Sequence, residues 1–248
     1  MTPLMDFPDA AEPTACLTRP DVPEEFSDPL LAITAAGDVF SPGGWFLKLA
    51  ELMLTKDPVE WAQEQLAGDW KAYAGCSQAW RNAGRACGAI ARNVEAGSKR
   101  VDATWDGHAA EAAIDYFEAL RKNLDDVQDA LDTMAEEYRV VTESIARTGQ
   151  AIGGCIGAII DALVSLSVTT AASTALGWTG GAAAMGYALG AMEAQVILME
   201  WERMSVLVNA AQLAMNASYA VMGRTGGEIL ARVHALPLPR TSYDHPAV

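Results

Sequence analysis

The sequence has few of the residues that build β-sheets. Only 7% of its 248 residues are aromatic, and Val and Ile are sparse beside the abundant Ala and Gly. This composition favours closely packed helices over sheets. Because 51% of the residues are hydrophobic, a sizeable core can still be buried. We therefore expect an all-α protein.

Basic side chains are also scarce. The chain has 17 Lys and Arg against 32 Asp and Glu, which gives a formal net charge of −15. A chain of this charge is repelled by phosphate backbones, so we expect no nucleic-acid partner. The first residues, MTPLMDFPDAAEP, lack the basic region and the apolar run of a Sec signal peptide.

Residues for catalysis or metal binding are few. None of the four cysteines forms a CxxC pair, and we interpret all of them as small core residues or free thiols. The three histidines are far apart and have no ligand spacing around them, so no metal site and no cofactor are expected. The motifs GxSxG, HExxH and GxxxxGK[ST] do not occur. These observations favour a non-enzymatic protein.

The strongest pattern begins at Asp57-Pro58, a good helix start because Asp caps free N–H groups and Pro suits the first helical position. Apolar or small residues then recur with 4-3 spacing, as in a heptad seam. Charged residues fill the positions between them. The first series is Leu66, Trp70, Tyr73, Ser77, Trp80, Gly84, Cys87, Ala91, Val94, Ser98, Val101 and Trp105.

Trp105-Asp106-Gly107 interrupts this rhythm. Gly107 can adopt the positive φ that ends a helix, and Asp106 can cap the next one. The 4-3 spacing then resumes, again with charged residues between its members. The second series is Ala113, Phe117, Leu120, Leu124, Val127, Leu131, Met134, Tyr138, Val141, Ile145, Thr148 and Ile152. Two matched series around one turn predict a long antiparallel helical hairpin.

The composition changes after residue 150. Residues 162–192 contain no charged side chain, and Gly180-Gly181 is a turn signal. We expect helices at about 149–176, 182–223 and 227–235. The chain is thus divided into a Pro-rich acidic, partly disordered lead (1–42), a hairpin with a preceding short helix at 44–55 (43–150), an Ala/Gly-rich hydrophobic helical region that extends the hairpin into a bundle (151–235), and a disordered tail (236–248). One helical turn is expected near Leu30 to Ala35.

The uncharged region has two interpretations. Residues 149–197 are long enough for a membrane-inserting hairpin, with small residues such as Gly153 and Gly157 allowing close helix approach. Against a constitutive span, Asp161 is costly in a bilayer, and Ser, Thr, Gly and Ala dominate. We favour buried helices of a soluble bundle, with insertion under some condition left open.

Aromatic side chains are the candidate contact residues. Trp70, Trp80 and Trp105 fall on the first seam, where core packing is the simplest role. Trp61 lies nine residues before Trp70 and can cover the base of the hairpin or meet a partner. Phe117 and Tyr138 are the aromatic members of the second seam.

Two long amphipathic helices joined by Trp105-Asp106-Gly107 resemble the WXG100 (ESAT-6-like) superfamily, helical hairpins exported by type VII (ESX) secretion systems. DPVEWAQEQLAGDW followed by WDGHAAEAAIDYF is similar to longer actinobacterial members. The resemblance implies an export-signal role for Trp105 and Gly107, with Asp106 between them in the turn. The family's Tyr-x-x-x-Asp/Glu signal is missing, because Tyr138 is followed at that offset by Thr142.

The resemblance implies a non-enzymatic, type VII secretion-associated protein that acts through helix-face contacts as a secreted substrate, partner or oligomeric scaffold. Its partner would be a WXG-like protein or a second copy of the chain. It would be secreted or cytoplasmic, because a bound partner can supply the missing export signal. Two alternatives remain: a membrane-perforating protein that inserts residues 149–197, and a cytosolic chaperone or adaptor for a toxin.

Overall fold

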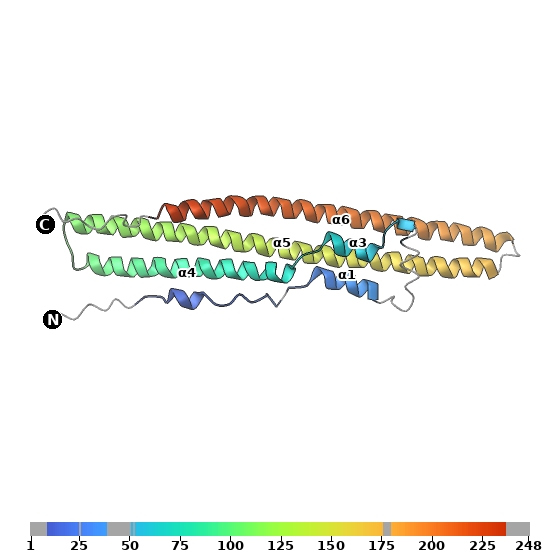
Figure 1. Cartoon of the computed structure of the whole chain (residues 1–248), viewed down its shortest axis with the longest axis horizontal. Coiled ribbons are helices and arrows are strands. Elements are labelled where there is room, and N and C mark those ends of the chain that lie inside the picture. The colour runs from blue at the N-terminus through green and yellow to red at the C-terminus, as the bar shows by residue number, and fades with distance from the viewer. Residues whose placement is uncertain (1–8, 25, 39–50, 52, 176–179, 237–248) are drawn as a thin grey trace. The chain divides into compact units, whose positions relative to one another are not determined.

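The structure is a computed structural model that describes residues 9–24, 26–38, 51, 53–175 and 180–236, with side chains described outside 169–189. Over this part of the chain the regular elements are all helices and no strand occurs, which confirms the all-α expectation. The elements in chain order (Figure 1) are η1 (Pro13–Cys16), α1 (Pro29–Asp38), α3 (Pro58–Gln65), α4 (Trp70–Asp102), α5 (His108–Ala175) and α6 (Gly180–His234).

The chain divides into two compact units, each assembled from separate segments. Unit 1 comprises Met1–Val22, Ala74–Arg139 and Ser218–Val248. Unit 2 comprises Pro23–Tyr73 and Val140–Ala217. The helices α4, α5 and α6 therefore each contribute residues to both units, and each unit has buried apolar residues of its own.

In unit 1, α4 packs against α5 through small residues. The Ser77 hydroxyl donates a hydrogen bond to the Ala135 carbonyl (2.8 Å). Further along α4, a Cβ added at Gly84 would lie 3.1 Å from the Asp132 carboxylate. Residue numbers thus rise along α4 as they fall along α5, so the two helices run antiparallel within this unit (Figure 1). Large apolar side chains of α5, Leu124, Val127, Leu131 and Met134, are buried in this unit.

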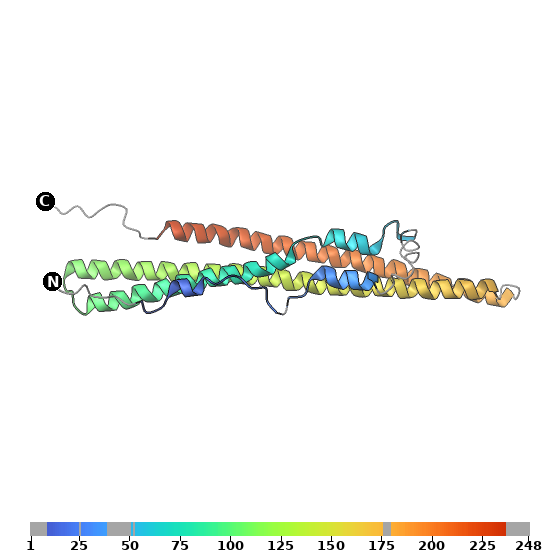
Figure 2. The same ribbon diagram turned by 60° about the horizontal axis from the view of Figure 1, so that its bottom comes forward.

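The N-terminal segment lies along α4 in the same unit (Figure 2). The Asn93 side chain donates to the Ala11 carbonyl (2.8 Å) and accepts from the Ala11 N–H (2.8 Å). The buried Asn82 amide donates to the carbonyl (3.1 Å) and hydroxyl (3.0 Å) oxygens of Thr18. Two asparagines of α4 therefore hold an extended segment that has little helix of its own.

Unit 2 is built around the apolar part of α5. Its core contains Ile33 of α1, Ala62 of α3, and Ile197, Met204 and Val208 of α6, packed with Ile152, Ile156, Ile159, Ile160 and Leu163 of α5. The helix α1 comes very close to α5, because a Cβ added at Gly149 would lie 2.5 Å from the Pro29 Cβ. It is longer than the single turn expected near Leu30 to Ala35, since it extends over Pro29–Asp38.

The helix start at Asp57-Pro58 is confirmed. The Asp57 carboxylate accepts hydrogen bonds from the N–H groups of Val59 (2.7 Å) and Glu60 (3.2 Å). The prediction that one helix continues from there through the seam is wrong, because α3 ends at Gln65 and α4 begins at Trp70. Asp69, whose carboxylate accepts from the Ala72 N–H (2.9 Å), caps the new helix.

Two expected helix boundaries, near residues 149 and 223, do not occur. The helix α5 continues through residues 149–151, and α6 continues through Gly223, Gly226 and Gly227 to His234. Packing explains part of this: Gly149 and Gly153 lie against α1, and a Cβ at Gly226 would be in ordinary contact with Met134 (3.8 Å). Close packing at these positions outweighs the weak helix propensity of glycine. Of the short helix expected at 44–55, only residues 51 and 53–55 are described. Residues 51, 53 and 54 are helical, and Thr55 lies outside the helix with a φ of +62°.

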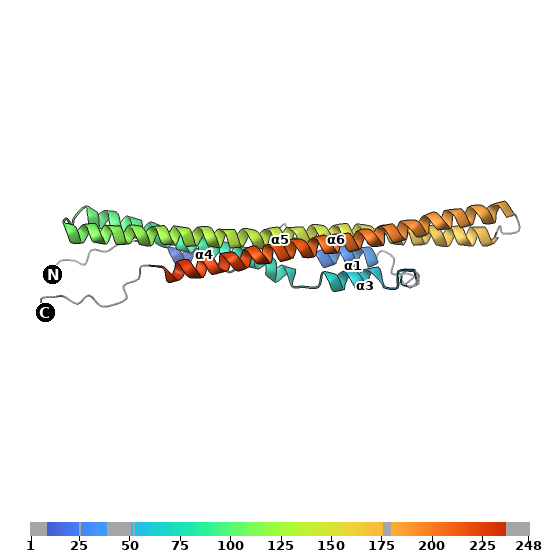
Figure 3. The same ribbon diagram turned by 90° about the horizontal axis from the view of Figure 1, so that it is seen from above.

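The helices α5 and α6 lie side by side within unit 2 (Figure 3), and they are separated near the expected turn signal at Gly180-Gly181. The helix α5 ends at Ala175 and α6 begins at Gly180, so both glycines of the expected turn signal belong to the start of α6. Residues 176–179 lie outside the described part of the chain.

Candidate functional site

The turn between α4 and α5 occupies residues 103–107. The Trp105 N–H donates to the Val101 carbonyl (2.9 Å), which extends the last turn of α4. Gly107 has a φ of +100°, and its carbonyl accepts from the N–H groups of Ala110 (2.9 Å) and Glu111 (3.1 Å). Nothing lies within 4 Å of a Cβ added at Gly107, so backbone conformation rather than space requires glycine there.

Asp106 does not cap α5 as expected. In the described turn the first hydrogen bonds of α5 go to the carbonyl of Gly107, and Asp106 is exposed. His108 is exposed beside the turn, and its Nδ1 lies 3.2 Å from the Glu111 carboxylate. The turn therefore owes its shape to Gly107, while the side chain of Asp106 points to solvent.

Trp105 is not a core residue. Its side chain is 45% exposed, and the residues from 102 to 109 are exposed as well. The core prediction failed because the heptad rhythm directs side chains inward only while the backbone is helical, and α4 ends at Asp102. The consequence is a large indole at the surface of the turn.

The other members of the first seam do face inward or sit at its edge. Trp70 is buried, and its indole N–H donates to the Leu66 carbonyl (2.8 Å). Its ring meets Tyr73 edge to face, with centroids 5.9 Å apart. Trp80 is half-buried. These side chains stabilise the helices, and Trp70 has little surface left for a partner.

Trp61 is half-buried and lies next to Trp201, with ring centroids 4.8 Å apart and planes inclined by 51°. It thus packs within unit 2. Phe117 and Tyr138 are both half-buried, and Phe117 meets Tyr116 edge to face (5.5 Å). Of the aromatic contact candidates, Trp105 is the most exposed.

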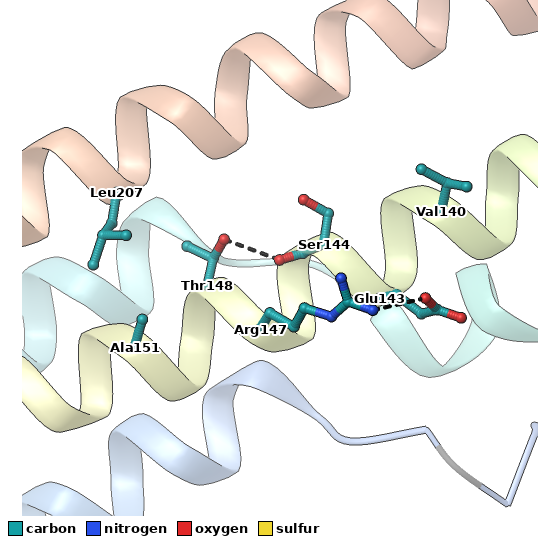
Figure 4. Close-up of a pocket in the computed structure, with 7 residues that line it drawn as sticks. All are labelled: Val140, Glu143, Ser144, Arg147, Thr148, Ala151 and Leu207. Carbon is teal, nitrogen blue, oxygen red and sulfur yellow. Dashed lines mark hydrogen bonds and ion pairs between the residues drawn. The ribbon is translucent and has the colours of Figure 1, made fainter.

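A shallow pocket opens between α5 and α6 within unit 2 (Figure 4). It has a volume of about 580 Å³, and seven residues line it: Val140, Glu143, Ser144, Arg147, Thr148, Ala151 and Leu207. Its charged groups are already paired, because Arg147 donates to Glu143 (3.2 Å). Thr148 donates to the Ser144 carbonyl (2.9 Å), so its hydroxyl is also engaged. The lining gives no arrangement of nucleophile and base.

One thiol is buried beside a carboxylate in unit 2. Burial first, and then the neighbouring Glu200 carboxylate, raise the pKa of Cys155 to about 11. One oxygen of Glu200 is buried without a hydrogen bond, and Arg203 lies 3.6 Å from it. A thiol with a pKa this high is a poor nucleophile at neutral pH. All four cysteines are free in the structure.

Acidic side chains between the seam positions of α5 make local ion pairs. Arg121 pairs with Asp125 (2.7 Å), and Arg232 of α6 pairs with Asp126 (2.9 Å) within unit 1. Within the described residues no group of three or more His, Cys, Asp or Glu side chains could hold a metal ion.

Sequence reasoning missed an exposed apolar face on α6. Five large side chains of this face are at the surface: Met192, Val196, Met199, Val206 and Leu213. The signal for it was the 4-3 spacing that runs through residues 192–217, which lies on the opposite side of α6 from the buried Ile197, Met204 and Val208. A helix that is apolar on both sides shows weak overall amphipathicity, so its second face is easily overlooked.

The helix α5 is long and apolar enough to cross a membrane. This applies to its described side chains, His108–Val168, and rests on length and composition alone. About 39% of its most apolar stretch is buried inside the fold. Core helices of soluble proteins meet the same criterion of length and hydropathy, so this is weak evidence for a membrane span.

Comparisons with models of protein families, with characterised proteins and with solved structures give no match for this chain.

Proposed function

We propose that the chain is a non-enzymatic, WXG100-like protein associated with type VII secretion, and that α4 and α5 form its antiparallel hairpin. The hairpin would act through its helix faces, as a secreted substrate, a partner or a scaffold. Support comes from two features: seam residues that are buried or half-buried from Leu66 to Val101 and from Ala113 to Ile152, and a Trp-x-Gly turn between the two helices.

The observation that carries the proposal is the exposed indole of Trp105 next to the positive φ of Gly107. Folding alone gives little reason for a large aromatic side chain at this position, because 45% of it remains in contact with solvent. Exposed aromatic side chains on rigid turns are good anchors for a protein partner. Gly107 would hold the turn in the shape that presents Trp105.

Recognition in this proposal has two parts. The turn supplies Trp105 and Gly107, and a bound partner supplies the Tyr-x-x-x-Asp/Glu signal that this chain lacks. The partner, a WXG-like protein or a second copy, would bury an apolar helix face in the manner of other helix-in-groove complexes. The shallow pocket of unit 2 and the unreactive Cys155 add no support for catalysis.

Export of a tagged chain from an actinobacterial host tests the proposal. We expect Trp105→Ala to reduce the exported protein at least tenfold while the soluble intracellular protein stays constant. Because Trp105 is exposed, its removal should cost little stability. The matched control is Tyr219→Ala on α6, which removes an aromatic side chain of similar exposure (47%) far along the chain.

Three outcomes separate the alternatives. Equal export of Trp105→Ala and the wild type would contradict the signal role. Equal loss of intracellular and exported protein would mean that Trp105 serves the fold. Retention of the wild type in the cell together with a bound toxin would favour the chaperone or adaptor.

The apolar part of α5 supports one alternative, insertion of residues 149–197 into a membrane. Insertion would have to pull Ile152, Ile156 and Ile160 out of the unit 2 core, which opposes it. Dye release from liposomes at pH 7 and at pH 5 tests this. Release by the wild type would favour perforation, and intact liposomes at both pH values would exclude it under these conditions.

A further inference from the structure

The exposed face of α6 in unit 2 forms a continuous heptad stripe. Its large members are Met192, Val196, Met199, Val206 and Leu213, which we call the α6 stripe. The remaining seam positions between residues 192 and 217 carry Arg203, Ala210 and Ala217, and all three are exposed. This spacing, with steps of four and three residues, is the one that lets two helices pack along a seam.

We propose that the α6 stripe is a self-association surface on which the same stripe of a second copy packs antiparallel, about a two-fold axis near residues 204 and 205. A two-fold contact uses the same patch on both copies, so the patch must complement itself. The stripe meets this condition in side-chain size and in charge.

Size complementarity depends on direction. In the antiparallel register, Met192 faces Ala217 of the second copy, and Met199 faces Ala210. Val196 faces Leu213 in the layer between them. These layers pair a large side chain with a small one, or two of intermediate size, which fills the space evenly. In the two central layers Arg203 faces Val206 of the second copy. A parallel pair would instead set Met199 against Met199 and Ala210 against Ala210, and bulges would alternate with voids.

Charge complementarity gives the same answer. The charged residues Glu193, Glu200, Glu202 and Arg203 all lie in the first half of the stripe, and residues 204–217 carry no charge. In the antiparallel pair, Glu202 lies beside the uncharged Asn209 of the second copy. Arg203 lies near the two-fold axis, within reach of the carboxylate of Glu202 of the second copy. In a parallel pair, Arg203 would meet Arg203 in a single layer, which is unfavourable.

The size of the contact predicts its strength. A helix face of 26 residues is about 38 Å long and about 10 Å wide. Two such faces bury roughly 800 Å² in total, below the range of about 1,200–2,000 Å² for stable interfaces and in that of weak, transient contacts. We therefore expect a reversible dimer with a dissociation constant in the micromolar range.

Sedimentation of the full chain over about 1 to 200 µM tests the surface. We expect the wild type to shift from monomer to dimer, and Met199→Glu to remain monomeric at 200 µM. The matched control is Leu198→Glu, because Leu198 is the adjacent residue with similar exposure (54% against 59% for Met199) but lies off the stripe. This variant should dimerise like the wild type.

Engineered cysteines test the direction. Met199→Cys and Ala210→Cys chains, mixed and oxidised, should form a disulfide between residues 199 and 210, identified by peptide mapping because four native thiols are present. Ala210→Cys alone should not link to itself, since the two copies of residue 210 lie about 16 Å apart in this register.

A wild type that stays monomeric, a dimer that survives Met199→Glu, or a Leu198→Glu variant that dissociates would each overturn the proposed surface. Disulfides between two copies of residue 210 would overturn the antiparallel direction. None of these results bears on export, so the test is separate from that of the Trp105 turn.

Discussion

At the scale of single residues, the thiol of Cys155 makes the clearest prediction. Burial and the Glu200 carboxylate raise its pKa to about 11, well above the ordinary value of about 9 for a free thiol. At pH 8 its thiolate fraction is about 100-fold smaller than that of an ordinary thiol. We expect iodoacetamide to label the half-buried Cys16 quickly and to leave Cys155 unlabelled over the same time, as read by peptide mapping.

Two controls sharpen this prediction. Labelling in 6 M urea should modify both thiols at similar rates, because unfolding removes the burial. Glu200→Gln should speed the labelling of Cys155 only severalfold, since burial is the larger cause and remains. Because the pKa of Cys155 is raised in the folded state, its protonated thiol contributes to stability. This contribution is complete below the unfolded pKa near 9 and is lost as the pH rises through the folded pKa of about 11. Rapid labelling of Cys155 in the folded wild type would mean that the unit 2 core is open.

Single residues also show where sequence reasoning stops. The positive φ of Gly107 was predictable, because only glycine adopts it readily. The exposure of Trp105 was not, since it depends on α4 ending at Asp102 rather than at the turn. The anchoring of the N-terminal segment by Asn82 and Asn93 was equally hidden, because the partners lie 64 and 82 residues away along the chain.

At the scale of elements, the contact between α1 and α5 in unit 2 depends on a glycine. A Cβ added at Gly149 would lie 2.5 Å from the Pro29 Cβ and 2.7 Å from its carbonyl oxygen. Both neighbouring groups belong to a rigid ring or to the backbone, so neither can move aside cheaply. Overpacking of this kind costs about 1–3 kcal/mol. We therefore expect Gly149→Ala to destabilise the protein and to loosen α1.

The matched control is Gly154→Ala, five residues along the same helix, where nothing lies within 4 Å of the added methyl group. Alanine is the better helix former by about 0.5–1 kcal/mol, so this variant should be more stable than the wild type. Urea unfolding followed by circular dichroism measures both changes, and hydrogen exchange over residues 29–38 reports on α1. Equal stability of the two variants would contradict the close contact of α1 with α5.

Helix boundaries were harder to predict from the sequence than the buried faces of the helices, because boundaries also depend on contacts made in the folded chain. The 4-3 spacing predicted which side chains of α5 turn inward, because periodicity is set by helix geometry alone. It could not place the break at residues 66–69, because the seam spacing continues through Gly68 and the capping Asp69 although the helix is interrupted there. The change in composition and the glycines predicted helix boundaries near residues 149 and 223–227 that do not occur. Packing of Gly149 and Gly226 against other helices is a property of the folded chain.

At the scale of the whole molecule, charge and apolar surface act in opposite directions. Every chain carries a formal net charge of −15 at pH 7, so two copies repel each other at a distance. Local pairs such as Lys99 with Glu95 (2.6 Å) and Arg121 with Asp125 (2.7 Å) do not reduce this net charge, which already counts both partners of each pair. The proposed contact through the α6 stripe, in contrast, is mainly apolar, so its attraction does not depend on opposite charges.

This opposition predicts how self-association responds to salt. Raising the ionic strength from about 0.01 M to about 0.15 M shortens the screening length from about 30 Å to about 8 Å. The repulsion between two copies then weakens, while burial of Met192, Met199 and Leu213 is nearly unchanged. We expect the dissociation constant of the dimer, measured by sedimentation at pH 7, to fall severalfold over this range. Met199→Glu should stay monomeric at both salt concentrations. A dimer that dissociates as salt is added would instead be held by ion pairs, and the apolar stripe would not be its interface.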